Sequence, residues 1–349
     1  MRFTHRILEE KKIALGIGAG IGAALVGWWA WQRSSTPPLP DSWEEVGEVS
    51  ELVIYPVKSA RGLRQKEGQA GIYGLSSNHL EDRVFMVVNA EGTLVTSRQA
   101  ERLAAVVTEW QGHTLTLKFP GHEDVSVDVE NGLRDRPVVV SKFRALKLQG
   151  IDCGDEVSAW LSTVLHDDKE KVRLIFKGDL VKDRPAEIPQ VKHEFTQYNK
   201  RDRAVYTDDS SYHLACQSSL EELNSRLDAP IPMDHFRPNI VVSGSQAYDE
   251  DDWVYAKIGE VILRRLKPCE RCLLTTVDPI KGKRNKNMEP LTTLKKYRLL
   301  KDAPPELVTA WKSKPIFGLT MSIDATGRIA VGDKVFIARA SVYPQFRGY

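Results

Sequence analysis

The 349-residue sequence contains few cysteines, and this scarcity excludes a disulfide-stabilised fold. The four that occur, Cys153, Cys216, Cys269 and Cys272, are too few and too unevenly spaced for a disulfide framework. A reducing compartment therefore fits the chain. In such a compartment a CxxC pair indicates metal binding or redox chemistry.

The sequence also lacks the features that accompany nucleic-acid and nucleotide binding. Its formal net charge is +2 and its tryptophans and tyrosines are dispersed, so we expect no nucleic-acid partner. No GxGxxG loop follows a strand-like run, no H-x3–5-H pair occurs, and no internal repeat is present. With 42% hydrophobic and 28% charged residues, the chain can form one large or two medium domains.

One stretch near the N-terminus carries no charge. Residues 13–31, as a helix with a rise of about 1.5 Å per residue, would nearly span the roughly 30 Å hydrocarbon core of a bilayer. Basic residues flank the stretch, and three tryptophans at its end suit the membrane interface. We therefore predict a single N-terminal transmembrane helix. A cleaved signal peptide is the alternative, although its shorter apolar region would end in small residues.

The rest of the chain is predicted to be mostly β with a few helices (α+β), in barrel-like sheets. Apolar spacing predicts a helix over residues 154–166, a capping box at Ser218 with Glu221 begins a second, and a third covers 291–298. A polar stretch at 182–203 could divide two domains. Short β-branched or alternating runs predict strands over residues 49–59, 83–89, 114–121, 125–129, 136–143, 239–244, 254–259, 261–267 and 331–340.

The main functional motif is the segment 268–279, which contains Cys269 and Cys272. A structural zinc site needs four ligands, and a thioredoxin-like dithiol needs the pair at a helix N-terminus, so spacing disfavours both. Two buried, inert cysteines are a further alternative. The remaining interpretation is one thiolate ligand to a soft metal, with Arg271 beside the sulfur to hold it deprotonated.

Six separated motifs then resemble a known family. CERCLLTTVDP, FRPNIVVSG and VGDKV resemble the MOSC domain, the C-terminal domain of molybdenum cofactor sulfurases. IYPVKSARG, EDRVFMVVN and TSRQAERL resemble the β-barrel region that accompanies it. Together they resemble the mitochondrial amidoxime-reducing components. The resemblance implies a membrane anchor (1–33), a linker (34–48), a MOSC N-terminal β-barrel region (49–183) and a MOSC β-barrel domain (184–340).

Carried over motif by motif, the resemblance implies that Cys272 is the catalytic residue and the protein ligand to molybdenum. The cofactor has a phosphate and an anionic dithiolene, which arginine, lysine and serine side chains can bind. Arg98 is a further candidate for a pocket contact. The implied cofactor-binding residues are Lys58, Ser59, Arg83, Ser210, Arg237, Asn239, Glu270, Arg271 and Cys272.

Asp209 departs from the family pattern, which places a small hydroxyl residue at this position. A carboxylate that faced a phosphate would repel it. We therefore expect Asp209 to contribute its backbone N–H alone or to point away, and Ser210 to be the more direct contact.

The resemblance also implies a function. The expected activity is molybdenum-cofactor-dependent reduction of amidoximes, N-hydroxyguanidines and hydroxylamines to their N–H products and water. Electrons would come from NADH through NADH-cytochrome b5 reductase and cytochrome b5, at the mitochondrial outer membrane, with the catalytic domain facing the cytosol. A basic turn of Lys281, Lys283, Arg284 and Lys286 is the predicted docking face, and an ordinary solvated loop is the alternative. A non-enzymatic cofactor carrier or a sulfur-transfer module is the alternative function.

Overall fold

The computed structural model describes residues 39–143, 146–180, 184–186, 198–300, 308–309, 311 and 313–343. The chain divides into two compact units, residues 1–42 and 43–349, and every element below belongs to the second. The predicted anchor lies outside the described residues. Among the residues that are described, no helix has the length and apolar character needed to cross a membrane.

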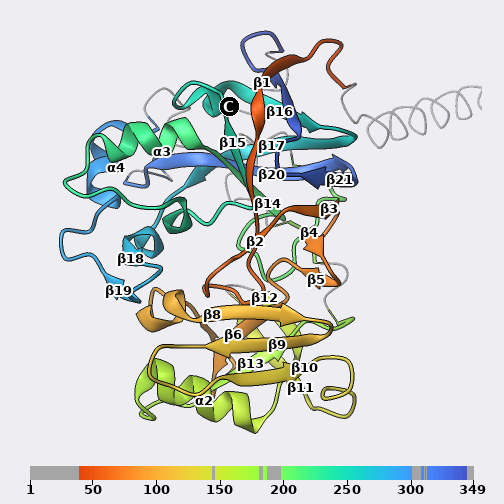
Figure 1. Ribbon diagram of the computed structural model, residues 1–349, viewed down its shortest axis with the longest axis vertical. Coiled ribbons are helices and arrows are strands. Elements are labelled where there is room, and N and C mark those ends of the chain that lie inside the picture. The colour runs from red at the N-terminus through yellow and green to blue at the C-terminus, as the bar shows by residue number, and fades with distance from the viewer. Residues whose placement is uncertain are drawn as a thin grey trace, which may run out of the picture. The chain divides into compact units, whose positions relative to one another are not determined.

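A seven-stranded barrel forms the upper part of Figure 1. Six strands follow in the order β15-β14-β20-β17-β16-β22, and β1 closes the barrel by pairing with both β22 and β15. The β14–β15 pair is parallel and its neighbours are antiparallel. The strands are β1 (Glu44–Ile54), β14 (Tyr212–Cys216), β15 (Ile240–Ser243), β16 (Trp253–Ile258), β17 (Val261–Glu270), β20 (Ile316–Ala325) and β22 (Lys334–Arg339), and β2 (Leu63–Gln65) pairs with the end of β1.

Smaller sheets come mostly from the N-terminal half of the chain, and Figure 1 shows the largest of them below the barrel. A five-stranded sheet has the order β11-β12-β13-β6-β7, and one bridge between Thr93 and Lys142 joins its two edges. Its strands are β6 (Phe85–Asn89), β7 (Leu94–Val95), β11 (Val138–Phe143), β12 (Leu146–Asp152) and β13 (Val172–Phe176). A three-stranded sheet contains β8 (Val107–Gln111), β9 (Thr114–Lys118) and β10 (Val125–Asp128). A four-stranded sheet contains β3 (Glu67–Gly71), β4 (Gly74–Ser77), β5 (Leu80–Glu81) and β21 (Gly327–Ala330). The hairpin β18 (Val277–Asp278) with β19 (Lys283–Arg284) forms a two-stranded sheet.

Three α-helices are present in the described residues, α2 (Asp155–His166), α3 (Gln217–Asn224) and α4 (Leu291–Tyr297). Short 3-10 helices are η1 (Glu101–Ala105), η2 (Met233–His235), η3 (Asp249–Asp252) and η4 (Leu273–Thr276). The mostly β, α+β class predicted from the sequence is therefore confirmed.

Two local predictions were wrong. The helix α3 begins at Gln217 directly after strand β14, with Cys216 as its N-cap and no side-chain cap, so Ser218 lies within the first turn. The neighbouring Ser219 instead donates its hydroxyl to Glu250. The first strand begins at Glu44 and ends at Ile54, because the chain beyond it turns to pair Val57 with Phe85 in another sheet.

Candidate functional site

The predicted cofactor-binding residues surround one cavity of about 280 Å³. It lies where strands of the barrel meet the segments that follow β1 and β5 and the loop after β17. The walls contain all nine predicted residues and also Arg98, so the structure brings every candidate together. The further lining residues are Thr96, Thr207, Asp208, Asp209, Tyr212, His213, Phe236, Cys269, Leu274, Thr275, Lys314 and Thr320.

Two arginines in the wall are organised around the buried ring of Tyr55. The guanidinium carbons of Arg83 and Arg237 lie 4.7 and 4.2 Å from the ring centroid. Arg83 also donates to the backbone oxygen of Arg237 at 3.2 Å and pairs with the buried Asp82. Burial is the main reason that the pKa of Arg237 falls to about 10, which still leaves the group charged at neutral pH.

Asn239 connects this arginine pair to the barrel. Its side-chain oxygen accepts from Arg83 at 3.3 Å and from the backbone N–H of His213 at 3.3 Å, while its amide donates to the backbone oxygen of Val53 at 3.1 Å. The side chain is thus largely engaged by protein groups. Its geometry makes it a support for the wall as well as a candidate cofactor contact.

Three of the lining residues have left-handed backbones. The φ angles are 75° at Ser59, 51° at Arg83 and 58° at Arg237. Each such conformation costs a non-glycine residue on the order of 1–3 kcal/mol and is found preferentially at ligand-binding sites. Their concentration at one cavity is consistent with a binding role.

The two cysteines of the CxxC motif occupy different surroundings. Cys272 is exposed and precedes η4, whereas Cys269 is half-buried at the end of β17. Arg271 donates to the sulfur of Cys269 at 2.9 Å, so the prediction that it accompanies the metal-binding sulfur is corrected. Burial raises the pKa of Cys269 despite this guanidinium. The other terminal nitrogen of Arg271 donates to the backbone oxygen of Phe236 at 2.7 Å, so both terminal nitrogens are engaged with groups other than Cys272.

Sequence reasoning missed His213, which lines the cavity from strand β14. Its Nε2 lies 3.5 Å from a terminal nitrogen of Arg271. Burial, Arg271 and Arg83 lower the pKa of His213 well below its usual range, so the imidazole is neutral near pH 7. Gly318 leaves room for the ring, since a Cβ there would lie 2.7 Å from Nε2. No local sequence pattern marks this histidine.

Each carboxylate in the wall is paired with a lysine. Lys58 lies 2.7 Å from Asp208, and Lys267 lies 2.8 Å from Asp209 and 2.5 Å from Glu270. Burial opposes the charge on Lys267, but the two carboxylates prevail and raise its pKa above the usual range. The carboxylate of Asp209 is therefore directed to a lysine, and the sequence contained no sign of this partner.

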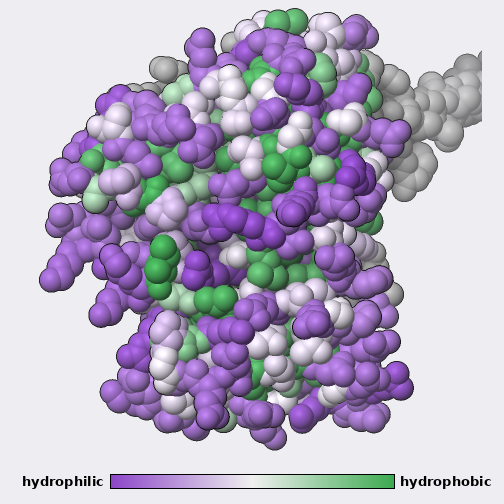
Figure 2. All heavy atoms as spheres, viewed as in Figure 1, coloured by the Kyte–Doolittle hydropathy of each residue, from purple (hydrophilic) through white to green (hydrophobic). Residues whose placement is uncertain are grey.

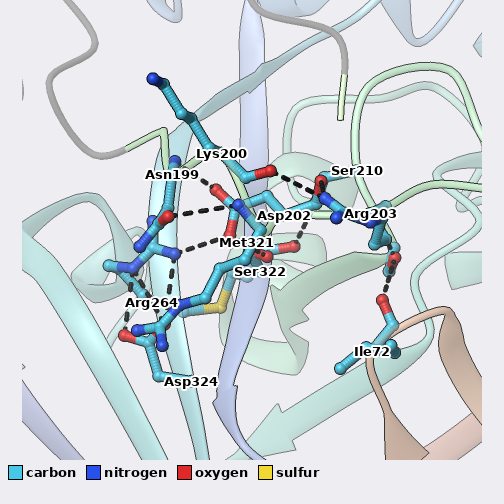
Figure 3. A network of polar contacts seen from close by, with 12 residues as sticks. Ile72, Asn199, Lys200, Asp202, Arg203, Ser210, Arg264, Met321, Ser322 and Asp324 are labelled. Carbon is cyan, nitrogen blue, oxygen red and sulfur yellow. Dashed lines mark hydrogen bonds and ion pairs between the residues drawn. The ribbon is translucent and has the colours of Figure 1, made fainter. Parts of the chain in front are cut away.

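A buried network holds the segment that contains Asp208 to Ser210. Asp202 Oδ1 accepts a hydrogen bond from Arg264 Nη2 at 2.7 Å and one from the hydroxyl of Ser322 at 2.8 Å (Figure 3). The same guanidinium also donates from Nε to Asp324. Ser210 donates to the backbone oxygen of Met321 at 2.7 Å. The segment is thus fixed to strands β17 and β20, which carry Arg264 and Met321.

The charge and the hydrogen-bonding state of the cavity suit an anion. Of the described lining residues, six are basic and three acidic. Within the described part of the chain, Arg237 and Arg271 form no salt bridge, and Arg237 Nη2 and Arg271 Nε are buried without hydrogen-bond partners. Unpaired buried guanidinium nitrogens carry a desolvation cost that a bound phosphate could offset.

Comparison with known proteins gives two family matches and many relatives. Residues 46–168 match the family described as "MOSC N-terminal beta barrel domain" and residues 201–336 match the "MOSC domain". "Mitochondrial amidoxime-reducing component 1" of Mus musculus is 37% identical over 331 residues, which cover 94% of this chain and 93% of that protein. The proteins of the same name from Xenopus laevis and Homo sapiens are each 35% identical, over 96% and 93% of this chain and 95% and 93% of their own lengths.

Proposed function

This chain belongs to the family of mitochondrial amidoxime-reducing components, with a MOSC N-terminal and a MOSC domain, and on that premise we propose that it is a molybdenum-cofactor-dependent oxidoreductase. The membership confirms the resemblance found in the six sequence motifs. The observation that carries the proposal is the meeting of an exposed Cys272 with unpaired, buried guanidinium nitrogens of Arg237 and Arg271 in one cavity.

The residues of the cavity fit the proposed cofactor. The thiol of Cys272 is the soft ligand that molybdenum requires. Arg237 and Arg271, with Lys58 and Arg83, would hold the phosphate and the pterin, and Ser59 and Ser210 could add hydroxyl contacts. The bound cofactor would supply the two-electron chemistry, and the protein its orientation and charge.

The proposed substrates are N-hydroxylated compounds such as amidoximes, N-hydroxyguanidines and hydroxylamines. Loss of the N–O bond consumes two electrons and two protons and releases the N–H compound and water. His213 faces the cavity as a neutral imidazole, so it is suited to donate or accept a hydrogen bond and not to act as an imidazolium acid. We propose electron delivery from NADH through NADH-cytochrome b5 reductase and cytochrome b5. The names of the relatives support a mitochondrial location, and we propose the outer membrane, with the catalytic domain facing the cytosol.

The test is turnover of benzamidoxime to benzamidine by the purified protein with NADH, cytochrome b5 reductase and cytochrome b5. Molybdenum and pterin content are measured on the same preparation, and omission of cytochrome b5 is the control. We expect cofactor-loaded protein and turnover that depends on cytochrome b5. Cofactor-loaded protein that turns over no N-hydroxylated substrate would favour the cofactor carrier, and protein without molybdenum or pterin would contradict the proposal.

A further inference from the structure

Two of the three carboxylates in the cavity wall, Asp209 and Glu270, share one lysine, whereas the third, Asp208, pairs with Lys58. Asp209 precedes Ser210 in the chain, and Glu270, itself an implied cofactor contact, precedes Arg271. With an effective dielectric constant of 20, an unpaired carboxylate about 6 Å from a phosphate would weaken binding on the order of a hundredfold. The two carboxylates therefore need a compensating charge.

Lys267 provides a cation at the right place. Its side chain is 3% exposed, and it does not line the cavity but lies behind the two carboxylates that do. The amino group reaches Asp209 and Glu270 at 2.8 and 2.5 Å, from the same strand β17 that ends at Glu270. Its amino nitrogen also lies 5.4 Å from the centroid of the Trp311 ring.

This arrangement has an energetic asymmetry. Burying Lys267 without a partner would be costly, and the two partly exposed carboxylates would repel a bound anion if the lysine did not offset their charge. Replacing a paired buried cluster by neutral groups of similar volume is often tolerated, whereas removal of one partner is strongly destabilising. Lys267, Asp209 and Glu270 should therefore behave as one unit, which we term the acid–lysine triad.

We propose that Lys267 is a positioning residue which neutralises Asp209 and Glu270 from behind the cavity wall and so allows an anionic cofactor to bind beside two carboxylates. The triad accounts for the departure at Asp209: the position tolerates a carboxylate because its charge is directed away from the cavity, toward Lys267. This inference rests on the proposed function, because the anion that it concerns is the proposed cofactor.

The experiment compares the full chain with Lys267→Met and with the double variant Lys267→Met, Asp209→Thr, which keeps Glu270 because that residue is an implied cofactor contact. Molybdenum per protein is measured by metal analysis and pterin by the fluorescence of its oxidised form, after gel filtration. Lys177→Met is the matched control, because Lys177 also forms a partly buried ion pair, with Glu81, but does not touch the cavity. Thermal unfolding shows which variants are folded.

We expect Lys267→Met to lose cofactor content at least about tenfold, because Asp209 and Glu270 both lose the lysine that offsets their charge beside the anion. The double variant has one carboxylate fewer and should hold at least about threefold more cofactor than Lys267→Met, and Lys177→Met should keep full content. If Lys267→Met does not fold, a folded double variant should hold at least about threefold less cofactor than the unmodified protein, because Glu270 has then lost its lysine, and full content would contradict the triad.

Three results would overturn the inference. These are full cofactor content in folded Lys267→Met, loss in the double variant equal to that in Lys267→Met, or the same loss in Lys177→Met. The proposed function fails separately, when the unmodified protein itself carries neither molybdenum nor pterin.

Discussion

Cys269 and Cys272 are three positions apart in the chain and both line the cavity, yet their side chains are available to different partners. The sulfur of Cys269 accepts a hydrogen bond from Arg271, and burial raises its pKa. Cys272 is exposed, and its backbone oxygen, not its thiol, accepts from Thr275 in η4. Only the second thiol is therefore presented to a ligand.

We predict that Cys272→Ser abolishes molybdenum binding and reductase activity, whereas Cys269→Ser keeps most of both. A serine hydroxyl is a harder ligand and is not deprotonated near pH 7, so it cannot replace a thiolate. The loss for Cys272→Ser should exceed the roughly 10- to 100-fold that follows removal of an outer-shell partner. Metal analysis and turnover of both variants test this, and equal losses would show that the two cysteines act together.

Glu250 illustrates a buried carboxyl outside the cavity. It lies in η3, is 0% exposed, and accepts from the hydroxyl of Ser219 at 2.8 Å. Burial, with the neighbouring Asp251, raises its pKa to about 7, against a partial opposing effect of Arg298. The folded protein therefore holds this proton more tightly than the unfolded chain, whose glutamate pKa is about 4.3.

Because the folded pKa is raised, Glu250 destabilises the protein progressively as the pH rises from about 4.5 to 7, and by roughly 3–4 kcal/mol at most above that range. Glu250→Gln stays neutral, so we expect it to be more stable than the unmodified protein at pH 8 and similar to it at pH 4.5. Urea unfolding at the two pH values is the measurement. A stability difference that does not change with pH would contradict the assignment.

At the scale of elements, local patterns located several of the strands and the helix α2. Runs of β-branched residues identified β6, β9, β10, β11, β15, β16 and β17 to within a few residues at each end. β20 was missed: its sequence, IFGLTMSIDA, is interrupted by Gly318 and by small polar residues, so it shows no alternation although eight of its positions are buried. Neighbouring strands, and not its own sequence, determine this strand.

The site followed the same division between local and long-range information. Motif residues could be chosen one by one, because each lies in a recognisable segment. His213 and Lys267 could not be chosen in this way. His213 is relevant because it lies beside Arg271, which is 58 residues away in the chain, and Lys267 because it contacts both Asp209 and Glu270. The sequence also placed Arg271 beside the wrong cysteine, because spacing does not show which way a side chain turns.

The buried network around Asp202 is the element-level support of the cavity wall. We predict that Asp202→Asn destabilises the protein by about 3 kcal/mol, since the buried Arg264 would lose one of its two carboxylate partners and Ser322 its charged acceptor. The exposed pair of Arg102 with Asp167 is the control, and Asp167→Asn should change stability by less than about 1 kcal/mol. Urea unfolding measures both, and equal effects would show that the Asp202 network does not carry the segment.

At the scale of the whole molecule, the hairpin β18–β19 places basic side chains beside the cavity. Arg284 in β19 donates to the backbone oxygen of Arg98, a lining residue, at 2.8 Å and pairs with Glu101. The exposed Lys281, Lys283 and Lys286 are the remaining basic residues of the turn. Figure 2 shows a largely hydrophilic surface on the side of this hairpin.

We predict the effect of replacing both Lys283 and Lys286 by glutamate. If an acidic electron donor such as cytochrome b5 docks at this hairpin, the donor should transfer electrons to the variant several-fold more slowly at low salt. The effect should shrink as salt rises, because steering is screened. Arg328 and Lys334 provide a control with the same change in net charge, and β21, which carries Arg328, lies across the molecule from β19 in Figure 1. Stopped-flow reduction measures both, and equal slowing by the two variants would place the donor elsewhere.

The closing strand of the barrel comes from the beginning of the chain. The ion pair of Glu44 in β1 with Arg339 in β22 joins residues 295 positions apart. At about 5–20 residues per second, roughly 15–60 seconds of synthesis separate the appearance of these two strands at the ribosome. Until β22 emerges, β1 and β16 each lack a partner on one side, and such open edges invite aggregation. The barrel can therefore close only after β22 has left the ribosome, although the strand it joins, β1, is made first.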